Sequence, residues 1–208
     1  MSFAHWLPFA IASAIVIVIP GPTVLLVVSY ALGHGRRYAL ATTAGVALGD
    51  LTSMTASMVG LGAVLAASAT LFTAIKWVGA AYLVYLGGKL WRAPVVERDA
   101  PDVSETRTAR VFAHAYAVTT LNPKSIVFFV AFVPQFMDLH APMWPQAVVL
   151  EATFVVLASL NALGYAMLAS SARRAIRSRK VQRAVNRTGG TMLVGAGLLA
   201  ASWKSASA

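Results

Sequence analysis

Residues 39–67 read ALATTAGVALGDLTSMTASMVGLGAVLAA, a run with one acid, no base and no proline. A helix of about 20 apolar residues crosses the hydrocarbon core of a bilayer, and small side chains let helices approach closely in lipid. The run therefore predicts a membrane-spanning helix at about 40–67. The whole chain of 208 residues is 58% hydrophobic and 12% charged, with mean hydropathy +0.70. That charged share is about half of the roughly 25% typical of soluble domains.

Further apolar segments lie on both sides of this run. They predict helices at about 6–33, 70–91, 111–137, 146–170 and 187–204, and prolines interrupt the first and fourth. No Lys or Arg precedes the first segment, whereas a secretory signal peptide needs a positive n-region. We therefore expect an all-α integral membrane protein of about six transmembrane helices, with the first helix retained and the whole chain, 1–208, forming a single transmembrane domain.

The basic residues predict the orientation of these helices. Three connections, those after the first, third and fifth helices, hold 14 of the 17 Lys and Arg residues: Arg36, Arg37; Lys89, Arg92, Arg98, Arg107, Arg110; Arg173, Arg174, Arg177, Arg179, Lys180, Arg183, Arg187. Positive loops remain cytoplasmic, so both termini are expected outside. The cluster after the fifth helix is read first as a topology anchor and second as a membrane-lipid site. Because the net charge of +10 lies between apolar segments, no nucleic-acid partner is expected.

The two halves of the chain resemble each other. Residues 20–25 (PGPTVL) align with residues 122–127 (NPKSIV), and four positions of the third helix in each half match: Gly79, Leu83, Val84 and Gly87 with Gly189, Leu193, Val194 and Gly197. An odd number of helices per repeat reverses the second repeat in the membrane, as in many secondary transporters. We expect two inverted three-helix repeats, at about 6–91 and 111–204, joined by a cytoplasmic linker at about 92–110.

The two proline-containing breaks are candidate binding elements. They are Pro20-Gly21-Pro22-Thr23 in the first helix and Asn122-Pro123 in the fourth. Irregular backbone within a bilayer is tolerated where protein or a water-filled cavity satisfies it. Proline favours the first position of a new helix, and Asn is a good N-cap. Such a half-helix start presents N–H groups suited to a carboxylate. An ordinary kink is the alternative for either break taken singly.

Two charged residues fall within the predicted spans. Asp50 lies near the middle of the second helix, and Lys124 follows the second break. A charge at the helix centre costs about 2.5–3.5 kcal/mol on translocon scales, which is tolerable if the two residues pair or line a wet cavity. Asp50 could bind a substrate ammonium or carry a proton, and Lys124 could meet a carboxylate. A structural ion pair is the alternative. Glu151, shortly after Pro145, is expected chiefly to favour a helix N-terminus.

Several kinds of chemistry lack their residues in this sequence. There is no cysteine, which excludes disulfides and thiolate metal sites. The four histidines are scattered without metal-ligand spacing, and no P-loop, HExxH or nucleophile triad is present. We therefore assign no metal, no cofactor and no enzymatic activity.

Four motifs together carry a family resemblance: PGPT (20–23), GVALGD (45–50), GAAYLVYLGGKLW (79–91) and LNPKS (121–125). With these in this order, the chain resembles the LysE/RhtB family of amino-acid exporters over nearly its whole length. The resemblance implies a bacterial cytoplasmic-membrane protein that exports amino acids such as lysine, arginine, threonine, homoserine or leucine, driven by the proton motive force. It places the site on Pro20, Gly21, Pro22, Gly49, Asp50, Asn122, Pro123 and Lys124. Many members are predicted to dimerise, so the resemblance also allows a homodimer.

The sequence thus favours a secondary active amino-acid exporter, with substrate bound near the midplane between the halves and protons as coupling ions. One alternative is export of another small solute such as a metal cation, for which Asp50 with Thr52, Ser53 and Thr55 would supply oxygen ligands. A membrane-embedded enzyme would need a second intramembrane carboxylate or histidine that is not evident. A lipid-binding scaffold would not need two broken helices around buried charge.

Overall fold

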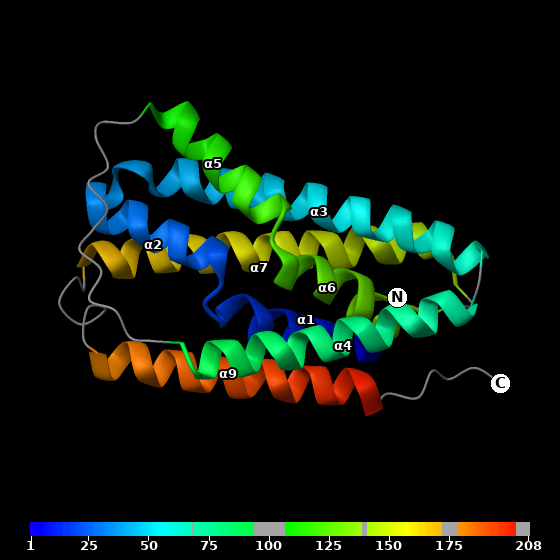
Figure 1. Cartoon of the computed structure of the whole chain (residues 1–208). Coiled ribbons are helices and arrows are strands. Elements are labelled where there is room, and N and C mark those ends of the chain that lie inside the picture. The colour runs from blue at the N-terminus through cyan, green and yellow to red at the C-terminus, as the bar shows by residue number, and fades with distance from the viewer. Residues whose placement is uncertain (68, 94–106, 139–140, 172–178, 203–208) are drawn as a thin grey trace.

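Long helices lie side by side along one direction in the computed structural model of the chain (Figure 1). The structure describes residues 1–67, 69–93, 107–138, 141–171 and 179–202. In these residues the elements are helical and follow in the order α1 (Phe3–Val18), α2 (Pro22–His34), η1 (Gly35–Tyr38), α3 (Ala39–Ala67), α4 (Ala69–Trp91), α5 (Thr108–Thr120), α6 (Pro123–Phe132), η2 (Val133–Phe136), α7 (Met143–Ser171) and α9 (Arg179–Ser202). The expected all-α fold is confirmed.

Each predicted segment is occupied by helix, and the prolines break two of them as expected. The first segment consists of α1 and α2, and the fourth of α5, α6 and the short η2. Helix Phe3–Val18 is bent by 53° against Pro22–Gly60, and Thr108–Thr120 by 44° against Pro123–Phe136. Both second pieces begin with proline at the first helical position, where its missing N–H is not needed.

One predicted helix start was clearly too late. The last helix begins at Arg179 rather than 187, whereas the starts at Phe3, Thr108 and Met143 lie within three residues of the predicted 6, 111 and 146. Lys180, Arg183 and Arg187 therefore lie within α9 and not in a connection. Their positive charge indicated a loop, but Lys and Arg are good helix formers, so a basic segment can continue a helix. Arg98, Arg173, Arg174, Arg177 and most of the expected linker lie outside the described residues.

Length and composition single out one described helix, Met143–Ala169, as able to cross a membrane by itself. The number rises to three if each of the two bent pairs forms one span. This count covers only the described residues, and α1, α2, α5 and α6 contain 16, 13, 13 and 10 residues. Each of these four is shorter than the roughly 20 residues that a span requires.

An aromatic core fills the space around α1, α6 and α7. Phe9, Phe128 and Phe154 are fully buried or nearly so, with ring centroids 6.3 Å apart for Phe9–Phe128 and 5.8 Å for Phe128–Phe154. These rings pack α6 against α1 and α7. Phe154 of this cluster also lines the cavity near the two breaks.

Helices α4 and α9 lie side by side with their backbones in close contact (Figure 1). A Cβ added at Gly87 would lie 2.6 Å from the Gly190 carbonyl oxygen, and one added at Gly197 would lie 2.7 Å from the Ala80 carbonyl oxygen. Glycine is needed at both positions because any side chain would force the helices apart. This is the small-residue packing expected between helices in lipid.

The exposed basic residues gather at one end of the bundle. Figure 1 shows that α2 ends, α5 begins and α9 begins at its left side, while α1 begins and α9 ends toward the right. The described basic residues of these segments are exposed: Arg36, Arg37, Lys89, Arg92, Arg107, Arg110, Lys180, Arg183 and Arg187. The bundle therefore has one strongly positive end, opposite the ends of α1 and α9 nearest the chain termini.

Candidate functional site at the two helix breaks

The two helix breaks meet in the middle of the molecule. The Asn122 side chain caps α6 by accepting a hydrogen bond from the backbone N–H of Lys124 at 3.1 Å. Its Nδ2 donates to the Thr23 hydroxyl at 3.1 Å, and Thr23 is the second residue of α2. Thr119, near the end of α5, donates to the same hydroxyl at 3.3 Å. The N-terminal turns of α2 and α6 are thereby joined side chain to side chain.

The C-terminal end of α1 lies at the same junction, and side chains of other helices bond to its carbonyl groups. A helix leaves its last four carbonyl groups without intrahelical partners. The Lys124 Nζ donates to the carbonyl oxygens of Val16 at 2.8 Å and Ile19 at 2.7 Å. The carbonyl oxygens of Ile17 and Val18, which lie between these two, are bonded by Asn161 and Tyr165 of α7.

Two polar side chains of α7 complete this arrangement. Asn161 Nδ2 donates to the carbonyl oxygen of Ile17 at 3.2 Å, and the Tyr165 hydroxyl donates to that of Val18 at 2.9 Å. The residues are one helical turn apart on α7, so they face the same way. Every carbonyl from Val16 to Ile19 therefore accepts a hydrogen bond from a side chain of another helix.

Asp50 lies on α3 beside this junction without a direct hydrogen bond or ion pair among the described residues. It is 4% exposed, and within the part of the chain that the structure describes it accepts no hydrogen bond and forms no ion pair within 4.0 Å. The direct ion pair with Lys124, one of the two arrangements that the sequence allowed, is not made, and Lys124, 7% exposed, lines the same cavity. The two opposite charges still interact electrostatically across this site, which offsets part of the cost of burying them.

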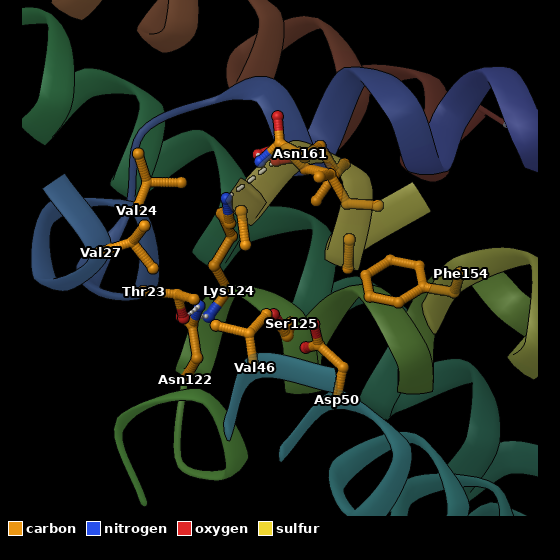
Figure 2. A pocket seen from close by; sticks show the side chains of 14 residues that line it. Thr23, Val24, Val27, Val46, Asp50, Asn122, Lys124, Ser125, Phe154 and Asn161 are labelled. Atoms are coloured by element: carbon orange, nitrogen blue, oxygen red, sulfur yellow. Dashed lines mark hydrogen bonds between the residues drawn. The ribbon is translucent and has the colours of Figure 1, made fainter. Parts of the chain in front are cut away.

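A cavity of about 30 Å³ lies between these groups (Figure 2). Its polar lining is Thr23, Asp50, Asn122, Lys124, Ser125 and Asn161, and its apolar lining is Val16, Ile17, Val24, Val27, Val46, Phe154, Ala158 and Ala162. A water needs about 10–15 Å³ measured in this way, so the cavity has room for about two waters. Binding of a larger molecule requires its wall to move.

The predicted site residues divide into two groups. Thr23, Asp50, Asn122 and Lys124 line the cavity, whereas Pro20, Gly21, Pro22, Gly49 and Pro123 shape the backbone around it without lining it. Gly21 lies beside the Lys124 side chain, where a Cβ would be 3.4 Å from Nζ, an ordinary van der Waals contact.

Gly49 serves the packing of α3. A Cβ there would lie 2.8 Å from the Thr119 Cβ and 3.0 Å from the Tyr116 carbonyl oxygen. The residue therefore lets α3 approach α5 closely and brings neighbouring Asp50 to the junction.

Sequence reasoning missed Ser125, Asn161, Tyr165 and the apolar wall. Asn161 is a single amide in the apolar run LASLNALGY, and a lone polar residue in a membrane helix is itself a signal of function. Tyr165 and the wall residues carry no such signal, because valine, alanine and phenylalanine are common throughout these helices.

Glu151 differs from its expected role. Helix α7 begins at Met143, so Glu151 lies about two turns inside it rather than in the first turn. Its Oε1 accepts a hydrogen bond from the Thr55 hydroxyl of α3 at 2.6 Å. Among the described residues, no three His, Cys, Asp or Glu side chains are placed to hold a metal ion together.

Broken helices are a feature of secondary transporters, and an all-helical fold with two broken helices at a cavity is consistent with a multi-pass membrane transporter. The sequence profile of the LysE type translocators matches residues 14–203, and the chain belongs to this family. The resemblance of its motifs to the LysE/RhtB exporters is thus confirmed.

Individual relatives agree with this assignment. The chain is 36% identical over 205 residues to a membrane protein of Vibrio cholerae, covering 99% of this chain and 100% of the relative. It is 33% identical over 207 residues to the homoserine/homoserine lactone efflux protein of Salmonella typhimurium, covering 99% and 100%. It is 28% identical over 178 residues to the leucine efflux protein of Klebsiella pneumoniae, covering 85% and 84%. No solved structure matches the chain.

Proposed function

We propose that the protein is a secondary exporter of neutral amino acids in the bacterial cytoplasmic membrane, driven by the proton gradient, with substrate bound at the junction of the helix breaks. The observation that carries this proposal is the lining of the cavity: one carboxylate, Asp50, and one ammonium, Lys124, which form no direct ion pair, beside the starts of two half-helices. An amino-acid zwitterion has the complementary pair of charges.

The placement of charge suggests how the zwitterion lies. Its carboxylate is attracted by Lys124 and by the N-terminal turns of α2 and α6, which carry partial positive charge. Its ammonium is attracted by Asp50. The main chain of any amino acid satisfies both contacts, so the apolar wall is left to select the side chain.

Neutral substrates fit this lining better than cationic ones. Asp50 is the only acid among the lining residues, and the substrate's own ammonium would engage it. A second positive charge, as in lysine or arginine, would be placed near Lys124 without a counter-charge. The names of two relatives, homoserine/homoserine lactone efflux protein and leucine efflux protein, agree with neutral side chains.

Asp50 is also the group proposed to couple transport to protons. Protonation removes its charge, and with it the attraction for the substrate ammonium. A proton arriving from outside therefore favours release there, and the proton then leaves to the cytoplasm as the empty site returns. No further ion is needed in this cycle.

The orientation and symmetry complete the proposal. The basic end of the bundle is assigned to the cytoplasm, which places both termini outside. The segments α1–α4 and α5–α9 are proposed as inverted repeats because Gly87 packs against Gly190 and Val194, and Gly197 packs in the matching way against Ala80 and Val84. The same sequence interval separates Gly87 from Gly197, Ala80 from Gly190, and Val84 from Val194.

The test is an efflux assay in cells that lack other exporters. The cells are loaded with dipeptides of leucine, homoserine, threonine or lysine, and the released amino acids are measured with and without the protein and with and without a proton gradient. We expect efflux of leucine or homoserine, lost when the gradient is collapsed, and little of lysine. Equal release with and without the protein, when the protein is shown to be in the membrane, would refute the proposal.

A further inference from the structure

The carbonyl groups at the C-terminal end of α1 accept hydrogen bonds from three side chains of other helices. Lys124 binds the carbonyls of Val16 and Ile19, while Asn161 and Tyr165 bind those of the two residues between them. Backbone groups within a membrane must be satisfied by protein. The three side chains therefore decide whether this end of α1 can remain where it is.

The carbonyl end of α1 is joined to α2 by a short non-helical segment, so it can move relative to α2. The chain from Ile19 to Gly21 is not helical, and the Ile19 and Gly21 backbones are extended. At its opposite end, α1 is fixed by a hydrogen bond from Trp6 Nε1 to the Thr153 hydroxyl at 2.9 Å. Since α1 forms the half of its span away from the basic end, its displacement would open the cavity on the side that the proposed orientation places outside.

The cavity and this contact share their residues. Val16, Ile17, Lys124 and Asn161 all line it, and at about 30 Å³ it is too small for an amino acid. The bonded carbonyl end of α1 is part of this wall, so its displacement would enlarge the cavity.

Lys124 has a competing acceptor when substrate is present. Hydrogen bonds from an ammonium to a carboxylate are charge-assisted and about twice as strong as bonds between neutral groups. A substrate carboxylate beside Lys124 can thus draw its Nζ away from the two backbone oxygens, which carry only partial charge.

We infer that Lys124, Asn161 and Tyr165 form a latch on the carbonyl end of α1, and that the carboxylate of a bound amino acid releases it by taking over the Lys124 ammonium. The inference rests on the proposed function and adds to it a division of labour. The substrate ammonium is recognised by Asp50, whereas the substrate carboxylate opens the exit. Asn161 and Tyr165 are positioning residues that set how readily α1 leaves.

Because the chain contains no cysteine, a single introduced thiol can report on the latch. In Val16→Cys the thiol is placed on a cavity-lining residue that is 2% exposed. Its labelling by a membrane-impermeant maleimide is measured from the outside of right-side-out vesicles. We expect L-leucine and L-homoserine to raise the labelling rate. The matching amines without a carboxylate, 3-methylbutan-1-amine and 3-aminopropan-1-ol, should not.

Latch variants in the Val16→Cys background separate the latch from mere packing. Removing one hydrogen bond in Tyr165→Phe should raise substrate-free labelling about two- to tenfold, whereas Tyr85→Phe, which removes an exposed hydroxyl elsewhere, should leave it unchanged. In Lys124→Gln labelling should be high and no longer respond to leucine. Unchanged labelling in Tyr165→Phe, or an equal response to leucine and to its amine, would overturn the latch.

A second readout covers the case in which Val16→Cys does not fold. Nitroxide labels on Val18→Cys, at the carbonyl end of α1, and on Val148→Cys of α7, both at exposed positions, report the distance between the helices by pulsed electron paramagnetic resonance. Leucine should populate a longer distance, and a single unchanged distance would overturn the latch. Leucine and homoserine efflux is measured on the same variants and on the wild type, so efflux with a closed latch refutes only this inference, and absent efflux of both amino acids by the wild type refutes the proposed function.

Discussion

Asn122 and Thr23 join the two broken helices through one hydrogen bond, in which the Asn122 Nδ2 donates to the Thr23 hydroxyl at 3.1 Å. The residues are far apart in sequence: Asn122 is the N-cap of α6, and Thr23 lies in the first turn of α2. The same Asn122 side chain uses its oxygen to cap α6. One amide therefore determines both where α6 begins and how close it lies to α2.

Two substitutions of Asn122 should separate these contacts. Asn122→Ala removes both, and loss of an N-cap costs about 0.5–2 kcal/mol of stability. Asn122→Asp keeps an oxygen for the Lys124 backbone N–H but cannot donate to Thr23 when ionised. We expect a lower thermal unfolding midpoint in detergent for Asn122→Ala, with Asn122→Asp retaining the cap but losing efflux. Wild-type efflux by Asn122→Asp would show that the link to Thr23 is dispensable.

Asp50→Asn should abolish gradient-driven efflux while leaving the protein folded. The substitution keeps the size of the side chain but removes the charge that attracts the substrate ammonium. Loss of a hydrogen bond to a charged group is worth about 1.5–3 kcal/mol, or about 10- to 100-fold in affinity. Leucine flux in proteoliposomes with an imposed pH gradient measures the effect.

The control for this substitution is Asp138→Asn, which changes an acid that does not line the cavity. Its flux should equal that of the wild type at matched protein level. Wild-type flux in Asp50→Asn would remove Asp50 from the mechanism, whatever the control shows.

Neighbouring glycines of α4 should respond oppositely to alanine. A Cβ at Gly87 would lie 2.6 Å from the Gly190 carbonyl oxygen, whereas a Cβ at Gly88 would have no atom within 4 Å. Overpacking costs about 1–3 kcal/mol, so Gly87→Ala should lower the unfolding free energy. Gly88→Ala should raise it by up to about 1 kcal/mol, because alanine is the better helix former. Equal unfolding curves for the two variants would contradict the packing of α4 on α9.

Gln146→Ala should destabilise the protein at the segment that precedes α7, because the Gln146 side chain bonds the backbone of that segment. Gln146 is 1% exposed; its Oε1 accepts from the Asp138 N–H, and its Nε2 donates to the Asp138 and Pro142 carbonyl oxygens, at 2.9, 2.9 and 3.2 Å. Buried backbone groups left without partners cost about 1–3 kcal/mol. Chemical unfolding should show this loss, and a smaller one in Gln135→Ala, whose side chain bonds a single carbonyl of its own helical segment. A loss in Gln135→Ala as large as that in Gln146→Ala would contradict this account.

The sequence predicted the elements and the breaks well because both depend on local chemistry. Apolar runs give the helices, and proline within a run removes a backbone hydrogen bond wherever it occurs, so Pro22 and Pro123 marked the new helix starts. The start of α9 could not be predicted in this way, since Arg179 and its basic neighbours suit either a helix or a loop.

The candidate site was predicted in part for the same reason. Asp50 and Lys124 stand out because charge is rare in apolar segments. The partners of Lys124 could not be predicted, because they are the carbonyl oxygens of Val16 and Ile19 and backbone atoms carry no sequence signal. Contacts between α1 and α7 depend on how the helices cross, which is a property of the whole fold.

The broken spans also have a consequence for biogenesis. At about 1.5 Å per residue, the 16 residues of α1 extend about 24 Å, short of the roughly 30 Å of a bilayer core, and α2, α5 and α6 are shorter. The packing partners of α1 and α2 include α7, and those of α6 include α3 and α4. The nascent chain must therefore hold its first span in the lipid with the carbonyl end of α1 unsatisfied until α6 supplies Lys124, and only partly satisfied until α7 supplies Asn161 and Tyr165.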